Sequence, residues 1–83
     1  MKHRKPTSDA LCPALEALIF DGGQVTLGAV GPVPNAAIAA MPTGMLAALV
    51  RRKDETLPQI LQRLDAALVQ AVSENRVISE FKL

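Results

Sequence analysis

The sequence predicts an α+β domain in which a three- or four-stranded antiparallel β-meander packs on one long C-terminal α-helix, with a short N-terminal helix. Three observations lead to this fold class. A leucine stripe with helical spacing runs through residues 57–74. Proline and glycine turn signals divide residues 24–52 into short β-prone segments. A shorter helical pattern precedes them at about residues 12–20.

The N-terminal end of the chain combines a basic leader with the short helix. Residues 1–8 are polar, so we expect a mobile leader before a single small domain, residues 9–83. Leu11, Leu15 and Leu18 have helical spacing. Pro13 suits a first turn, and Gly22 suits a helix end. In the alternative interpretation, residues 18–20 pair with residues 25–27 as a hairpin, because Asp-Gly favours tight hairpin turns.

The middle of the chain has the pattern of a meander. Residues 24–30 are rich in Val, Thr and Leu and predict the first strand. Residues 31–35 contain two prolines and predict a turn, because proline cannot donate to a central ladder. The second strand is predicted at 36–41, a turn at 42–44, and the third strand at 45–52. Residues 77–83 suggest a short edge strand anchored by Phe81 and Leu83.

The long helix has both end signals and a core-facing stripe. Thr56 lies three residues before Gln59, which is the spacing of a capping box, and Asn75 suits the C-terminal end. Asp54 and Glu55 place negative charge beside the helix N-terminus. We therefore predict a helix at 57–74. We expect its core residues to be Leu57, Leu61, Leu64 and Leu68.

The expected architecture leaves one face of the sheet without a helix. That face is rich in alanine, and the whole chain has no Trp or Tyr and two Phe residues. A domain this short buries a small core, and small domains often gain stability by association. The prediction is therefore a homodimer that acts as a protein–protein interaction module.

The charge pattern supports an alternative function. The net charge is +1, but the basic residues form two clusters: Lys2, Arg4 and Lys5 in the leader, and Arg51, Arg52 and Lys53 after the third strand. Such clusters can contact nucleic-acid phosphates. The chain lacks aromatic residues for base stacking, so single-strand RNA recognition is not expected.

Catalysis, cofactors and metals are not expected from this composition. His3 is the only histidine and lies in the leader, where it cannot be held against a nucleophile. Cys12 is the only cysteine, and we expect it to act as a small buried apolar residue in a protein of the reducing cytoplasm. No apolar run reaches the ~20 residues of a membrane span, and no glycine pattern matches a phosphate-binding loop.

Residues of about 23–72 resemble the β-β-β-α unit of HicB-type antitoxins. The similar features are Pro42 and Gly44 in a turn, a strand at Met45–Val50, and a helix opened by Glu55-Thr56-Leu57. The chain also resembles short bacterial proteins of accessory or mobile genome regions. The resemblance to HicB-type antitoxins implies a small antitoxin-like protein with this fold, whereas the second resemblance implies no known activity. The aromatic-rich first strands and the DNA-binding C-terminal segment of that family are missing here, so no family site is assigned to a residue.

Overall fold

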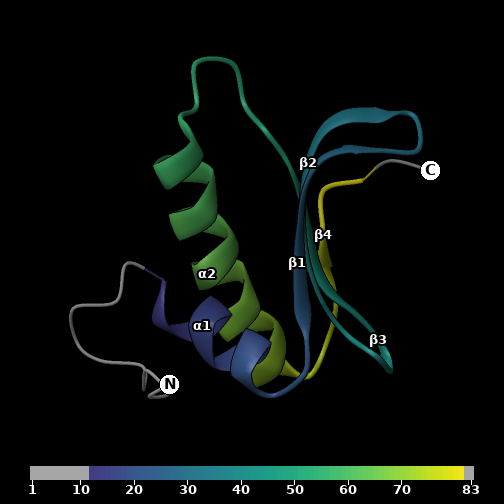
Figure 1. Ribbon diagram of the computed structural model, residues 1–83, viewed down its shortest axis with the longest axis vertical. Coiled ribbons are helices and arrows are strands. Elements are labelled where there is room, and N and C mark those ends of the chain that lie inside the picture. Colours follow the sequence, from purple (N-terminus) through teal and green to yellow (C-terminus); the bar gives the residue numbers. More distant parts are fainter. Residues whose placement is uncertain (1–11, 82–83) are drawn as a thin grey trace, which may run out of the picture.

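The structure, a computed structural model, describes residues 12–81 and has two layers. The elements follow in the order α1 (Pro13–Phe20), β1 (Gln24–Val30), β2 (Val33–Met41), β3 (Gly44–Val50), α2 (Leu57–Glu74) and β4 (Ile78–Ser79). Both helices lie on one face of the sheet (Figure 1). The predicted α+β fold is confirmed, while the leader of residues 1–8 lies outside the described residues.

The segment before the sheet is a helix, not the first half of a hairpin. Pro13 occupies the first turn of α1, where a backbone N–H would have no acceptor within the helix, so its absence costs no hydrogen bond. The helix ends because the backbone N–H groups of Asp21 and Gly23 both donate to the carbonyl of Leu18. Gly22 between them has φ +92°, which glycine adopts without a steric penalty. Gly23 must also be glycine-sized, because an added Cβ would lie 2.8 Å from the Ala40 carbonyl oxygen.

The sheet has the strand order β1-β2-β3-β4, and β1, β2 and β3 form the predicted antiparallel meander. The prediction of a turn over all of 31–35 is wrong, because β2 begins at Val33 and includes Pro34. Val30 pairs with Val33 and Gly28 with Ala36, so two residues of β2 lie opposite Ala29 alone. Pro34 therefore lies in a β-bulge, one of the few places in a sheet where proline costs no ladder bond. The third strand also ends at Val50, two residues earlier than predicted.

The last strand pairs differently from the predicted antiparallel sheet. Ile78 and Ser79 of β4 lie beside Ala47 and Ala48 of β3 in the parallel direction. The reason is the connection: α2 crosses back over the sheet between β3 and β4, which is how parallel neighbours are joined. Phe81 is half-buried after β4, and Leu83 lies outside the described residues.

Helix α2 has the predicted bounds and both predicted end signals. The backbone N–H of Gln59 donates to Thr56 Oγ1 over 3.3 Å, and the Thr56 N–H donates to Gln59 Oε1 over 2.8 Å. These two bonds form the capping box. At the other end, Asn75 adopts the left-handed conformation with φ 53° and ends the helix.

The core lies between the two helices and the near face of the sheet. Its buried residues are Leu15 and Leu18 of α1, Ile60, Leu64, Ala67 and Leu68 of α2, and Ala37, Ala39, Ala47 and Leu49 of the sheet. Leu64 is fully buried, as predicted, but Leu57 is 57% exposed, and its predicted place in the core is wrong. Helix α1 lies against the C-terminal half of α2 and leaves the first turn uncovered (Figure 1).

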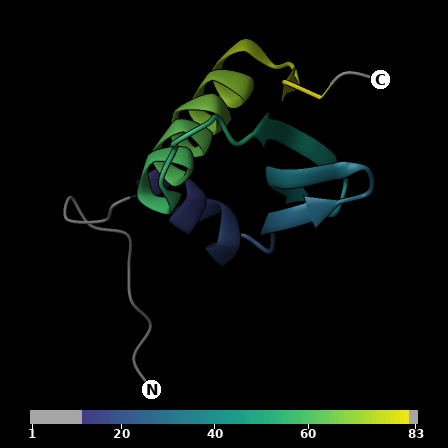
Figure 2. The ribbon, with the colours of Figure 1, turned by 90° about the horizontal axis from the view of Figure 1, so that it is seen from above.

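The opposite face of the sheet carries no helix within residues 12–81 (Figure 2). Strand alternation places Thr26, Ile38 and Ala48 on this face, and Thr26 pairs with Ile38 and Ile38 with Ala48. Ala48 is buried because β2 and β4 flank it, whereas Thr26 and Ile38 are half-buried. The face predicted to be uncovered thus has no helix over it, but only part of its surface is exposed to water, because neighbouring strands bury Ala48.

Candidate functional site

The basic triplet lies in the link between β3 and α2, surrounded by acidic groups. Arg51 Nε donates to the carbonyl of Glu55 over 2.8 Å. The Arg52 backbone N–H donates to Glu55 Oε1 over 2.9 Å, and its guanidinium lies 4.0 Å from Glu80. Lys53 is exposed. The leader residues predicted to join this cluster, Lys2, Arg4 and Lys5, lie outside the described residues.

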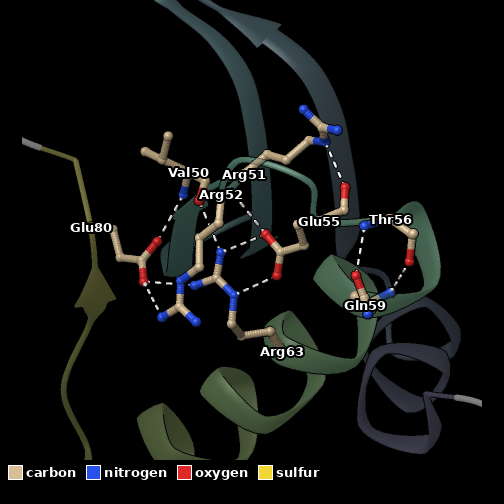
Figure 3. Close-up of polar contacts among 8 residues, drawn as sticks. All are labelled: Val50, Arg51, Arg52, Glu55, Thr56, Gln59, Arg63 and Glu80. Atoms are coloured by element: carbon tan, nitrogen blue, oxygen red, sulfur yellow. Dashed lines mark hydrogen bonds and ion pairs between the residues drawn. The ribbon is translucent and has the colours of Figure 1, made fainter.

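Arg63 of α2 is the centre of an ion-pair network behind the triplet (Figure 3). Its Nε donates to Glu55 Oε2 over 2.8 Å and its Nη2 to Glu55 Oε1 over 2.9 Å, a bidentate pair. Its Nη1 donates to Glu80 Oε2 over 2.7 Å. Nη2 also reaches the carbonyl of Val50, whose N–H donates to Glu80 Oε1. One guanidinium therefore joins the end of β3, the start of α2 and the segment after β4.

The network keeps the Glu55 carboxyl ionised. The hydrogen bonds from Arg63 and then the backbone N–H of Arg52 lower the pKa of Glu55 from 4.5 to about 2, although burial acts in the opposite direction. The same hydrogen bonds, which Arg63 donates to the Glu55 carboxylate, raise the pKa of Arg63. A carboxyl held at so low a pKa carries no proton near neutral pH, which suits a structural ion pair and not a general acid.

This network was not predicted from the sequence. Glu55 was assigned to the helix dipole and Arg63 was given no role, yet the Glu55 side chain is only 8% exposed and pairs with Arg63. A local signal was only partial, because Glu55 precedes the extended N-cap residue Thr56 and so lies outside the helical spacing that relates Gln59 to Arg63. Glu80 had no such signal, since it is 17 residues from Arg63.

Cys12 does not have the surroundings of a reactive thiol. It is half-buried at the start of α1 and packs against the core. Burial, and then the nearby charge of Asp65, raise the pKa of the thiol, which disfavours the thiolate. Within residues 12–81, no three His, Cys, Asp or Glu side chains lie together in a way that could hold a metal ion.

An apolar groove of about 510 Å³ lies where α1, the C-terminal half of α2 and the β2–β3 hairpin meet. Its lining includes Ala14, Ala17 and Leu18 of α1, Leu68, Val69 and Val72 of α2, and Met41 and Leu46 of the hairpin. Asp21 and Ser73 provide its polar side chains. Val69 is 54% exposed and Val72 is 65% exposed, so water contacts much of this apolar surface. We name this feature the α1–α2 groove.

A smaller hollow of about 140 Å³ lies between β1 and the first turn of α2. Leu27 and Leu57 line it, and both are exposed. Asn35 and Arg51 also line it, and its lining includes no residue of α1. It leaves an apolar surface beside the outer edge of β1.

Neither helix of the described chain has the length and apolar character needed to cross a membrane. Comparisons of the chain with protein-family models, curated proteins and solved structures found no match, so the resemblance to HicB-type antitoxins stays a prediction.

Proposed function

We propose that this chain is a non-enzymatic protein–protein interaction module that binds an amphipathic helix of a partner protein in the α1–α2 groove. The observation that carries the proposal is the exposure of Val69 and Val72 beside a groove lined almost wholly by apolar side chains. Exposed apolar surface of this kind commonly marks a site of protein association. The proposal fits the cytoplasmic location expected from the lone Cys12.

The form of the groove favours a helical partner. Its walls are two helices, and amphipathic helices commonly bind such grooves through apolar anchors three or four residues apart. Its volume of about 510 Å³ is sufficient for several leucine-sized side chains. Asp21 lies at the groove with an exposed carboxylate, so a Lys or Arg on the polar side of the partner helix would complement it.

The proposal is tested with synthetic amphipathic peptides that carry leucine anchors and lysines. We expect these peptides to shift the amide NMR signals of Ala17, Val69 and Val72. Val72→Lys should weaken peptide binding at least tenfold, because it places a charged ammonium group where the leucine anchors of the peptide would exclude water. Val77→Lys is the matched control, since Val77 is 48% exposed and does not line the groove.

Equal binding by Val72→Lys and wild-type protein would overturn the proposal. Peptides that leave the groove signals unchanged would overturn it as well.

The contrasting proposal, a nucleic-acid-associated regulator that uses Arg51, Arg52 and Lys53, has less support. The Arg51 side chain donates to the backbone carbonyl of Glu55, and the Arg52 guanidinium lies 4.0 Å from the Glu80 carboxylate. The nearby carboxylates of Glu55 and Glu80 offset part of the positive field.

A further inference from the structure

Strand β1 forms one edge of the sheet, and its outer side has no strand partner within residues 12–81. The strand order places β1 and β4 at opposite edges (Figure 2). The β4 edge has two paired residues, whereas β1 is seven residues long. An edge of this length presents a row of backbone donors and acceptors that another strand can pair with.

The hydrogen-bond alternation identifies which residues present these groups. The N–H of Arg51 donates to the carbonyl of Asn35, and Ala36 lies opposite Val50. In an antiparallel ladder, this arrangement directs the odd-numbered residues of β2 to β3 and the even-numbered residues to β1. Ile38 and Ala36 therefore bond to Thr26 and Gly28.

It follows that Val25 and Leu27 direct their backbone N–H and C=O groups away from the sheet. Their side chains share the helix-facing side, where Val25 packs against the core and Leu27 is 44% exposed. The free edge thus combines four available backbone groups with an exposed leucine.

Strand β1 also carries no charged residue or proline to protect its edge, and its one irregularity lies between Gly28 and Val30, beyond Val25 and Leu27. Residues 24–30 contain no charged residue and no proline, and no Lys or Arg occurs between Pro6 and Val50. Natural edge strands usually carry such residues to prevent pairing. Along β1 itself, a second copy of the strand would therefore meet no like charge, and the nearest basic side chain in the adjoining hollow is Arg51, whose Nε is bonded to the carbonyl of Glu55.

We propose that β1 pairs in the antiparallel direction with β1 of a second copy, about a two-fold axis at Thr26, to form a continuous eight-stranded sheet. In this register, Val25 lies opposite Leu27 of the partner subunit, and Leu27 opposite Val25 of the partner subunit. These two pairs supply four backbone hydrogen bonds, because both residues direct their polar groups outward.

This register matches the side chains as well as the backbone. The Val–Leu pairs are apolar and cover the exposed Leu27, with Leu57 adjacent on the same side. Thr26 lies opposite its own copy on the other face, and Thr–Thr is a favourable cross-strand pair. A register centred on Leu27 would extend the pairing to Ala29, which lies opposite the bulge of β2, where the ladder is irregular. Strand β1 of a second copy provides both the Val–Leu pairs and the Thr–Thr pair, so we assign a second copy of this chain as the partner.

Disulfide crosslinking tests both the edge and the register. Thr26→Cys in a Cys12→Ser background places two thiols opposite each other, with Cα atoms about 4.5 Å apart, within the ~4.4–6.8 Å that a disulfide spans. We expect mild oxidation to convert this variant to a covalent dimer. Ser79→Cys in the same background lies at the opposite edge and should stay uncrosslinked. Leu27→Cys is a register control and should crosslink much more slowly than Thr26→Cys.

Sedimentation supplies the second measurement. Wild-type protein should sediment as two chains at high micromolar concentration, and Leu27→Lys should sediment as one chain with an unchanged circular dichroism spectrum. A monomeric wild type overturns the proposal, as does a dimer in which Ser79→Cys or Leu27→Cys crosslinks as readily as Thr26→Cys. If Leu27→Lys does not fold, the crosslinking comparison alone still tests the proposed dimer.

The two proposals fail separately. Val72→Lys should remove peptide binding and leave the dimer intact, whereas Leu27→Lys should separate the dimer and leave peptide binding intact.

Discussion

Glu55 shows how a single side chain connects distant parts of this small chain. Its carboxylate receives two bonds from the Arg63 guanidinium and one from the Arg52 backbone, and Arg63 also binds Glu80. Breaking a well-formed pair leaves the remaining charge poorly solvated, so the loss usually exceeds the value of the intact pair. The stability of the β3–α2 link therefore depends on the charge state of Glu55.

Replacing Glu55 with glutamine should destabilise the protein in a pH-dependent way. The folded-state pKa, about 2, is below the ordinary 4.5, so ionised Glu55 contributes stability above about pH 4.5, and this contribution is lost as the pH falls toward 2. At pH 7 we expect Glu55→Gln to lower the free energy of unfolding by about 2–3 kcal/mol. This loss is somewhat smaller than for a fully buried pair, because Arg63 keeps its ion pair with Glu80. Urea unfolding at pH 7 and pH 3 should show a smaller difference from wild type at pH 3.

Glu74→Gln is the matched control for this measurement. Glu74 contacts Arg76 at the surface, where both side chains are largely exposed. Exposed ion pairs contribute little, so we expect a much smaller change in the free energy of unfolding than for Glu55→Gln at pH 7, and a similar one at pH 3. A loss for Glu55→Gln that is the same at pH 7 and pH 3 would contradict the assigned role of its charge.

The residues that sequence analysis identified correctly are those whose structure depends on near neighbours. Thr56 and Gln59 are three residues apart, and Asn75 directly follows the last turn of α2, so their local chemistry was sufficient. The contact between Arg63 and Glu80 depends on how α2 returns over the sheet, which no local pattern reports. The α1–α2 groove was not predicted for the same reason, because its lining comes from four elements.

Helix α2 shows that a regular apolar stripe does not bury evenly along its length. Leu57 and Leu64 are seven residues apart and lie on nearly the same side of the helix. Leu64 is fully buried under the sheet and α1, while Leu57 extends beyond the reach of α1. The stripe was therefore predicted correctly, but the position of its covering elements could not be read from its periodicity.

The same substitution at these two positions should have very different effects. Leu64→Ala leaves a cavity in the core and should cost about 2–5 kcal/mol, a large part of the ~4–12 kcal/mol that a domain of this size has. Leu57→Ala should change the free energy of unfolding by less than about 1 kcal/mol, since its side chain already contacts water. Urea unfolding at one low protein concentration measures both values. Similar losses at the two positions would show that Leu57 is more buried than described.

At the strand level, the direction of β4 and the extent of β2 are the parts that the sequence did not reveal. The meander was predictable because each hairpin turn has its own proline or glycine signal. The parallel direction of β4 depends on the long return through α2, and Pro34 is accommodated by a bulge whose register involves Ala29 on another strand. Both depend on contacts between segments.

For the whole molecule, the charge distribution leads to a prediction about nucleic acid. The net charge is +1, and Glu55 and Glu80 lie among the arginines of the basic triplet. We expect no measurable binding of the full chain to random duplex DNA at low salt, as followed by fluorescence anisotropy. Binding that falls steeply with salt concentration would contradict this and favour the nucleic-acid alternative. In that case Lys53→Gln should reduce the salt slope by about one.

The placement of both helices on one side of the sheet has a consequence for the proposed dimer. A two-fold axis through paired antiparallel strands runs perpendicular to the sheet, so it keeps equivalent faces together. Both α1–α2 grooves would then open on the same side of the assembly. A partner with two helical segments joined by a linker of suitable length would engage both sites at once. Such bivalent attachment would give an avidity well above the affinity of either segment alone.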